Sequence, residues 1–275
     1  MFVELDTVRR IEAAEASLTL EVARAVNAPG GLVRALGAGA GAWSPAGSPF
    51  DKVIGWGFGE DAADDAALRA FEAEVAARSG AVRVELATVH ALRHGEALTA
   101  RGYRVHGLEN VLGVRVGPAH AAAPAAPAVE VRPVAGGGEE EGWIDAVTTG
   151  FGEADPTDPA PHEAFDAELL KGIFRRMGAA SGLRRYLAFV DGAVAGGATM
   201  RVSGGIAQLA GAATRAAFRR RGVQAALLRA RLGDAAREGC DVAVVTTEPG
   251  SRSQRNVERS GFALLYGRLV LVRQA

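Results

Sequence analysis

The stretch Arg219–Leu228, RRRGVQAALL, joins three consecutive arginines and a glycine to the start of an apolar helical repeat. From Gly222 onward, apolar residues recur at the spacing of a helix, and Gly239 ends the run. The sequence therefore predicts a helix that begins at about residue 222. The first N–H groups of a helix have no partner within it and lie at the positive end of its dipole, so this end favours an anion.

The residues at this helix start suit a phosphate group. Arginine presents a planar, permanently charged fork that matches phosphate oxygens. Gly222 has no side chain that would keep a ligand away from the backbone. The alternative is an arginine-rich helix start that only faces solvent, with an ordinary turn glycine.

The flanking segments favour a ligand site. Residues 206–214 and 241–247 are predicted strands, the second of them buried. A parallel strand pair joined by a crossover helix places the helix start at the carboxyl ends of the strands, where open α/β sheets bind ligands. A P-loop is excluded because no Gly-Lys-Ser/Thr ending is present, and no Gly-x-Gly-x-x-Gly of a dinucleotide fold follows the strand.

These elements resemble the GNAT superfamily of acyl-CoA-dependent N-acetyltransferases. The coenzyme A motif of that family is Arg/Gln-x-x-Gly-x-Gly/Ala, and residues 219–224 fill its six positions. Gln224 departs from the final small residue, although Ala225 follows directly. The hairpin expected over 186–198, with Asp191-Gly192 as its tight turn, is also similar to the family. So is the ending of a short helix over 251–260, Gly261-Phe262 and a final apolar strand, so the resemblance covers about 129–275.

Composition bounds these expectations. The 275 residues suffice for two domains, and a hydrophobic content of 48% suffices for a core. A net charge of −1 gives no general attraction to nucleic acid or to an anionic membrane. Cys240 is the only cysteine, and we expect it to be packed rather than reactive. With no signal peptide or membrane span in view, we expect a cytoplasmic protein.

The chain also contains two similar halves. A Pro/Ala-rich segment, residues 117–128, separates them. Each half has a helix that ends at a glycine, a strand, a short helix and a further strand, and the glycine pairs Gly80/Gly102 and Gly239/Gly261 are both 22 residues apart. We therefore expect an α/β fold of two tandem GNAT-like domains, 1–117 and 129–275, joined by a linker over 118–128. Each domain would be a mixed, mainly antiparallel sheet flanked by helices; the alternative is a first α/β domain of different ancestry.

The first half lacks the arginines. The position that corresponds to Gly222 is Ala63, within the acidic segment 59–65, which holds four carboxylates. These charges suit a helix start but would repel a pyrophosphate. We therefore expect the first domain not to bind coenzyme A and to serve a structural or substrate-shaping role.

The resemblance implies transfer of an acetyl group from acetyl-CoA, as co-substrate and without a metal, to a primary amine of a small molecule or peptide. The amine would attack the thioester directly in a ternary complex, and backbone N–H groups would stabilise the oxyanion. The residues that the resemblance assigns to the coenzyme are Ala212, Ala213, Thr214, Arg219, Arg220, Arg221, Gly222, Val223, Gln224 and Ala225.

Catalytic side chains are less evident. Many relatives have a tyrosine on the short helix that protonates the leaving thiolate, but Val257 occupies that position here. Asn256, Ser253 and Tyr266 are the nearby polar residues. For the general base we favour Glu248 after the strand 241–247, against a plain loop glutamate.

The segment 152–163 would cap the acceptor site in this family. Its carboxylates favour a cationic acceptor, although charges on an exposed loop usually serve solubility. It holds the alternative base candidates Glu153, Asp155, Asp158 and His162.

Two other functions stay open. One is a coenzyme A-binding sensor or scaffold that has lost catalysis. The other is a nucleic-acid or phosphoprotein binder that uses residues 215–231, which the near-neutral charge and the lack of interleaved aromatic residues disfavour. We expect no nucleic-acid or membrane partner and either a monomer or a homodimer.

Overall fold

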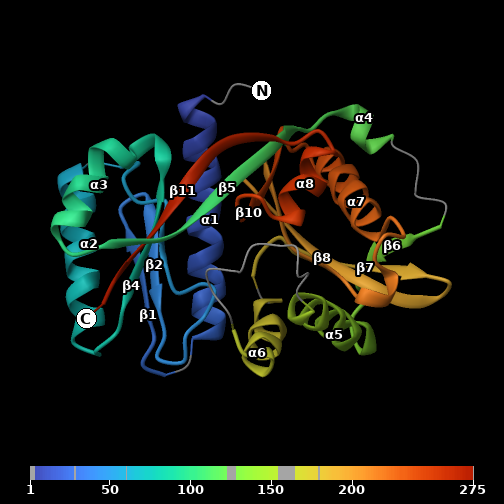
Figure 1. The fold of residues 1–275 in the computed structure, drawn as a ribbon, viewed down its shortest axis with the longest axis horizontal. Coiled ribbons are helices and arrows are strands. Elements are labelled where there is room, and N and C mark those ends of the chain that lie inside the picture. Colours follow the sequence, from blue (N-terminus) through green and yellow to red (C-terminus); the bar gives the residue numbers. More distant parts are fainter. Residues whose placement is uncertain are drawn as a thin grey trace. The chain divides into compact units, whose positions relative to one another are not determined.

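The computed structural model describes residues 4–27, 29–59, 61–122, 128–153, 165–178 and 180–274. It divides into two compact units. Of the described residues, the first unit comprises those up to Val111 and from Leu264 onward, together with Phe165, and the second comprises those from Leu112 to Glu153 and from Asp166 to Ala263. Figure 1 labels the elements along the chain.

The first unit carries a mixed sheet with strand order β1-β2-β3-β4-β11-β5. Strands β1, β2 and β3 form an antiparallel meander, β3 runs parallel to β4, and β11 runs antiparallel to β4. The elements of this unit are α1 (Leu5–Val26), β1 (Leu32–Leu36), β2 (Gly39–Trp43), β3 (Val53–Ile54), α2 (Asp61–Ala76), β4 (Val82–Ala87), the 3-10 turn η1 (Thr88–His90), α3 (Ala91–Ala100), β5 (Arg104–Arg115) and β11 (Ala263–Arg273).

The second unit repeats this plan with strand order β5-β10-β9-β8-β7-β6. Strands β6 to β9 are antiparallel neighbours, and β9 runs parallel to β10. The predicted fold class, a mixed and mainly antiparallel sheet with flanking helices, is therefore confirmed. The elements are α4 (Pro118–Ala121), β6 (Glu130–Pro133), α5 (Gly138–Gly152), α6 (Ala167–Met177), β7 (Leu183–Val190), β8 (Ala193–Ser203), β9 (Ile206–Thr214), the 3-10 turn η2 (Ala216–Phe218), α7 (Val223–Arg237), β10 (Val242–Thr247) and α8 (Arg252–Glu258).

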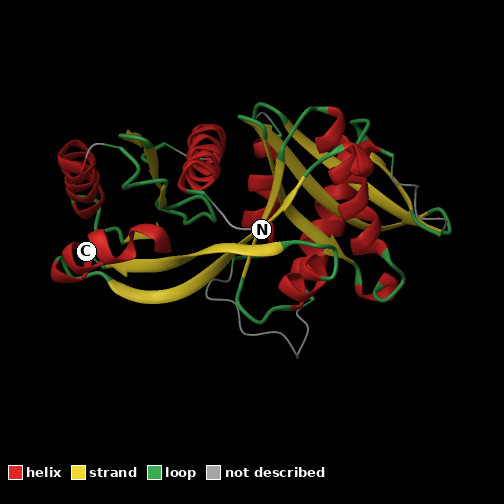
Figure 2. Ribbon diagram, turned by 90° about the horizontal axis from the view of Figure 1, so that it is seen from above, coloured by secondary structure: helices red, strands yellow, loops and turns green. Residues whose placement is uncertain are grey.

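Helices cover both faces of the second unit's sheet (Figures 1 and 2). Along β7, Tyr186 and Ala188 join the apolar cluster of α7 and α8, whereas Leu187 joins Trp143 of α5 and Phe174 of α6. This alternation follows from the two-residue period of a strand, whose successive side chains point to opposite faces. The sheet thus separates α7 and α8 from α5 and α6.

Local sequence signals produced the expected turns and caps. Asp191 and Gly192 have φ values of 52° and 78°, the left-handed pair that a two-residue hairpin requires. Helix α8 begins after Ser251, whose hydroxyl accepts from the N–H of Gln254 at 3.1 Å. In the predicted linker, residues 118–121 form the short helix α4, and 123–127 lie outside the described residues.

The last strand does not lie in the sheet expected from a division of the chain into domains 1–117 and 129–275. Residues Arg268 to Arg273 of β11 pair with Ala87 to Val82 of β4, so the end of the chain completes the sheet of the first unit. Strand β5 follows the first half in sequence but lies beside β10, and Val116 N–H donates to the Asp241 carbonyl at 2.9 Å. Apolar periodicity identifies both segments as strands, but it does not specify which neighbour each one pairs with.

None of the described helices combines the length and the apolar character that a bilayer span requires.

Candidate functional site

The start of α7 has the geometry predicted for an anion site. Gly222 caps the helix in the left-handed region at φ 81°, and a side chain at this position would point into open space. The first hydrogen bond of the helix runs from Ala226 N–H to the Gly222 carbonyl at 3.0 Å. The N–H groups of residues 223–225 therefore have no partner within the helix, and they lie at the positive end of its dipole.

Arg220 adds a second left-handed residue to this turn. Its φ is 62°, a conformation that costs about 1–2 kcal/mol for a residue other than glycine. Left-handed residues in a turn gather N–H groups into a concave array that binds anions. The guanidinium of Arg220 is exposed and has no partner among the described residues.

The other two arginines of the turn are held by acidic residues. Arg221 Nη2 lies 2.7 Å from Asp191 Oδ2 in the β7–β8 turn. Arg219 donates to the Glu153 carbonyl, and its Nη2 lies 3.8 Å from Glu153 Oε2. These pairs are solvent-exposed, and such pairs contribute about 0–1 kcal/mol. A phosphate can therefore compete for both arginines at small cost.

The strands in front of the helix start separate. The parallel pairing of β9 and β10 extends from Ile206↔Val242 to Gln208↔Val244, yet β9 continues to Thr214 and β10 to Thr247. Beyond Gln208 the β9 edge that faced β10 has no strand partner among the described residues. An extended ligand with amide groups can bind such an edge.

A bulge interrupts β9 within the same segment. Gly197 pairs with Ala213 and Thr199 pairs with Ala210, so Gly211 and Ala212 both stand opposite Ala198. Gly211 has φ 58°, as the first residue of a glycine bulge does. Of the predicted oxyanion residues, Ala212 belongs to this bulge, and Ala213 and Thr214 pair again with Gly197 and Gly196 of β8.

Helix α5 closes the opposite side of this segment. A Cβ on Gly150 would lie 2.7 Å from Ala213 Cβ, so only glycine permits this contact. At the end of the helix, Glu153 Oε2 accepts from Ala216 N–H at 2.8 Å. The sequence suggested Glu153 as an alternative base in an acceptor loop, whereas in the structure it anchors the arginine turn.

The catalytic candidates do not form one cluster. Glu248 is half-buried directly after β10, and Asn256 is half-buried on α8. Val257 is 7% exposed and packs in the apolar cluster of α7, so the position of the family's tyrosine is part of the core. Asp155, Asp158 and His162 lie outside the described residues.

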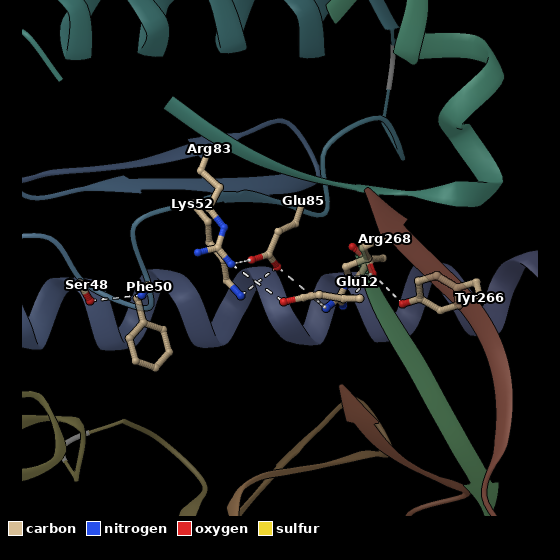
Figure 3. Close-up of polar contacts among 9 residues, drawn as sticks. Glu12, Ser48, Phe50, Lys52, Arg83, Glu85, Tyr266 and Arg268 are labelled. Atoms are coloured by element: carbon tan, nitrogen blue, oxygen red, sulfur yellow. Dashed lines mark hydrogen bonds and ion pairs between the residues drawn. The ribbon is translucent and has the colours of Figure 1, made fainter. Parts of the chain in front are cut away.

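Tyr266 belongs to the first unit rather than to the unit of Glu248 and Asn256. Its hydroxyl donates to Glu12 Oε1 at 2.5 Å, and Arg268 Nε donates to the same oxygen at 2.9 Å (Figure 3). Burial raises the pKa of Tyr266 well above its usual value, and the Glu12 carboxylate raises it further. Its proton is therefore held within the first unit.

Two hydroxyl groups near the separated strands were not anticipated. Thr214 and Thr247 end β9 and β10, and the Oγ1 atom of each is buried without a hydrogen-bond partner among the described residues. A buried hydroxyl without a partner is uncommon, because its desolvation is not compensated. The position of each threonine as the last residue of its strand was the signal in the sequence.

In the first unit, a side chain of the corresponding helix binds the loop that precedes it. The Asp64 carboxylate is buried and accepts from the N–H groups of Gly57 at 3.3 Å and Gly59 at 3.1 Å. Trp56 Nε1 donates to the Asp64 carbonyl at 2.8 Å. That the first unit does not bind coenzyme A stays a prediction.

The sequence of the second unit is similar to one known protein family. Residues 146–262 match the family model described as the acetyltransferase (GNAT) family. No curated protein sequence matches the chain.

Solved structures share the fold over nearly the whole chain. A GCN5-related N-acetyltransferase from Kribbella flavida is 20% identical, with 96% of each chain covered and a TM-score of 0.66. A tandem GNAT protein from the clavulanic acid biosynthesis pathway, solved without AcCoA, is 14% identical over 100% of this chain and 97% of that chain, with a TM-score of 0.60. A conserved protein of unknown function from Staphylococcus epidermidis is 10% identical over 86% and 90% of the two chains, with a TM-score of 0.58. Residues 146–262 therefore match the model of the GNAT acetyltransferase family, and the chain has the fold of tandem GNAT proteins.

Proposed function

We propose that the second unit transfers an acetyl group from acetyl-CoA to a primary amine of a small molecule or peptide, by direct attack in a ternary complex. The observation that carries this proposal is the position of the open start of α7 next to the separated ends of β9 and β10. A pyrophosphate fits the first feature and a pantetheine chain fits the second.

The coenzyme site uses mainly backbone groups. The N–H groups of residues 220–225 bind the pyrophosphate, and the exposed Arg220 adds charge without losing another partner. The β9 edge beyond Gln208 receives the pantetheine amides. The N–H groups of residues 212–214 receive the thioester oxygen, whose negative charge grows during attack.

The proton transfers fall to side chains near the strand ends. Glu248 accepts the proton of the incoming amine, directly or through water, since a half-buried carboxylate after β10 lies at the open end of the strands. Asn256, which has no side-chain partner among the described residues, donates a hydrogen bond to the leaving thiolate. A thiol with a pKa of about 8.5 is a tolerable leaving group without a strong acid.

Tyr266 belongs to the first unit and donates its hydroxyl to Glu12, so this proposal assigns it no proton transfer. The acceptor is a cationic or neutral amine on this proposal, because Glu248 and the carboxylates of the predicted acceptor loop disfavour an anion.

One observation favours a second function, a coenzyme A-binding sensor. Val257 is buried among apolar side chains, so no hydroxyl stands at the position where many relatives protonate the thiolate. Such a protein would bind acetyl-CoA at the same residues and release no thiol.

The test uses the full chain with acetyl-CoA and a panel of primary amines. We expect acetyl-CoA to raise the melting temperature and at least one amine to cause release of free thiol above the rate of hydrolysis. Thermal stabilisation with no thiol release from any amine would favour the sensor. If acetyl-CoA neither stabilises the protein nor releases thiol with any amine, both functions are excluded.

A further inference from the structure

A buried arginine of α7 contacts the bulge of β9. Arg231 is 3% exposed, and its Nη1 donates to the Thr199 carbonyl at 3.0 Å and, at a longer 3.4 Å, to the Ala210 carbonyl. Its Nε donates to the Leu227 carbonyl of its own helix at 3.1 Å. Among the described residues no carboxylate pairs with this guanidinium.

Packing does not explain a cation at this place. The neighbouring side chains of α7, Leu227, Leu228 and Leu232, belong to the apolar core. A charge buried without a counter-ion costs several kcal/mol, whereas a methionine of similar length would fill the space without that cost. Burial lowers the pKa of Arg231 to about 10, so the group still carries its charge at neutral pH.

The two β-strand carbonyls belong to one cross-strand pair, Thr199↔Ala210, which borders the bulge. Thr199 is the first residue of β8 that pairs normally after it, and Ala210 directly precedes Gly211 on β9. Thr199 Oγ1 also donates to the Ala210 carbonyl, at 2.9 Å. A planar guanidinium that binds both carbonyls holds the two strands in one relative position.

The Ala210 carbonyl and the Gly211 N–H belong to the same peptide group. A cation that binds the carbonyl polarises this peptide group and makes its N–H a stronger donor. The next N–H groups, of Ala212 and Ala213, are those assigned to the oxyanion. The guanidinium therefore acts on both the direction and the strength of these donors.

We propose that Arg231 is a positioning residue that holds the β9 bulge and thereby aims the N–H groups that follow it, those of residues 212–214, at the thioester oxygen. The inference rests on the proposed acetyl transfer and names a residue of that site. Arg231 touches no substrate itself. It also connects the two parts of the site, since it belongs to the helix whose first turn binds the pyrophosphate.

Arg201 is a matched control. It is 4% exposed on β8, and it donates from Nε to the Ser181 carbonyl at 3.1 Å and from Nη1 to Gln208 Oε1 at 3.1 Å. Replacement of either arginine by methionine removes a buried guanidinium from the same strand region. The two differ in their acceptors, since Arg231 donates to the Ala210 carbonyl beside the bulge and Arg201 to the Ser181 carbonyl and Gln208.

The experiment compares Arg231→Met, Arg231→Lys and Arg201→Met in the full chain. Displacement of an oxyanion donor lowers kcat by about 100-fold, and we expect such a loss in Arg231→Met with KM for acetyl-CoA within about two-fold of the wild type. Arg231→Lys retains a cation that can reach one carbonyl, so it should recover part of kcat. Arg201→Met should lose thermal stability but keep kcat. A kcat in Arg231→Met no lower than in Arg201→Met would overturn the proposal.

A second readout does not depend on activity. In Arg231→Met, the amide ¹H–¹⁵N chemical shifts of Gly211, Ala212 and Ala213 should change by more than the median change over all assigned amides. In Arg201→Met, they should stay near their wild-type values. If the wild type releases no thiol, acetyl transfer fails as the function and these shifts alone decide the role of Arg231. Unchanged shifts at all three amides contradict the inference whether or not the wild type is active.

Discussion

Helices α2 and α7 follow the same kind of strand in the two units, but the loops that lead into them have different contacts. Before α2, the buried Asp64 carboxylate accepts from Gly57 and Gly59. Before α7, Gly222 opens to empty space and the N–H groups of residues 223–225 precede the helical ladder. The loop before α2 is therefore closed by a carboxylate of its own helix, whereas the start of α7 stays open, and the proposed coenzyme site depends on that difference.

The largest effect should come from placing an acid at the open helix start. Gly222→Glu brings a negative charge against the pyrophosphate, and we expect affinity for acetyl-CoA to fall at least about 100-fold, or about 2.7 kcal/mol. Isothermal titration calorimetry measures this loss.

Gly239→Glu is the control at the other end of the same helix. Gly239 has φ 73° and also faces open space, so the backbone strain of the two variants is similar. Equal loss of affinity in both variants would show that strain, rather than charge at the helix start, weakens binding.

The second effect concerns the internal anion of the first unit. Asp64→Asn weakens the buried hydrogen bonds to Gly57 and Gly59, and we expect the free energy of unfolding to fall by about 2 kcal/mol. Urea unfolding measures this change. Asp65→Asn is the control, since Asp65 forms partly exposed ion pairs with Arg69 and Arg101. A larger loss from Asp65→Asn would mean that Asp64 does not stabilise this turn.

The third prediction compares the contributions of Arg220 and Arg221 to acetyl-CoA binding. Arg220 is exposed and without a partner among the described residues, whereas Arg221 is paired with Asp191. We therefore expect Arg220→Gln to weaken acetyl-CoA binding by about ten-fold, because a charge-assisted hydrogen bond contributes about 1.5 kcal/mol, and Arg221→Gln to weaken it less. The difference should shrink as salt concentration rises. A larger effect of Arg221→Gln would indicate that the Asp191 pair opens on binding.

The smallest effect should come from replacing Asp191, the acidic residue that pairs with Arg221. Asp191→Asn releases Arg221, and asparagine tolerates the left-handed conformation that Asp191 adopts at φ 52°. We expect acetyl-CoA to bind up to about three-fold more tightly, within the range of one exposed ion pair. Weaker binding in this variant would show that Asp191 orients Arg221 for the ligand.

Local patterns predicted much of the second unit. The helix from about residue 222, the strands at 206–214 and 241–247 and the hairpin turn at Asp191-Gly192 were all evident in the sequence and are confirmed by α7, β9, β10 and the β7–β8 turn. Each depends on residues within one segment, where glycine conformation and apolar period act directly. The position of β11 beside β4 was not predictable in this way, since an apolar strand fits several sheet edges equally well.

The same distinction, between features set within one segment and features set by distant contacts, applies to the candidate site. The arginine turn and Gly222 were evident because a helix start is defined by consecutive residues. Glu153 at the turn, Arg231 at the bulge and the hydrogen bond from Tyr266 to Glu12 were not, because their partners lie far away in the chain. A side chain's neighbours across such separations depend on packing rather than on its own segment.

The sequence by itself determined that one helix start of this protein is basic and the other acidic, and from this charge difference we predict that the second half of the chain binds an anion. Only the tertiary structure decided what those charges do. The fold buries Asp64 against N–H groups in the first unit, separates β9 from β10 in the second, and assigns the last strand of the chain to the first unit. The reason is that helix starts follow from local backbone and charge, whereas strand pairing and burial follow from contacts between distant residues.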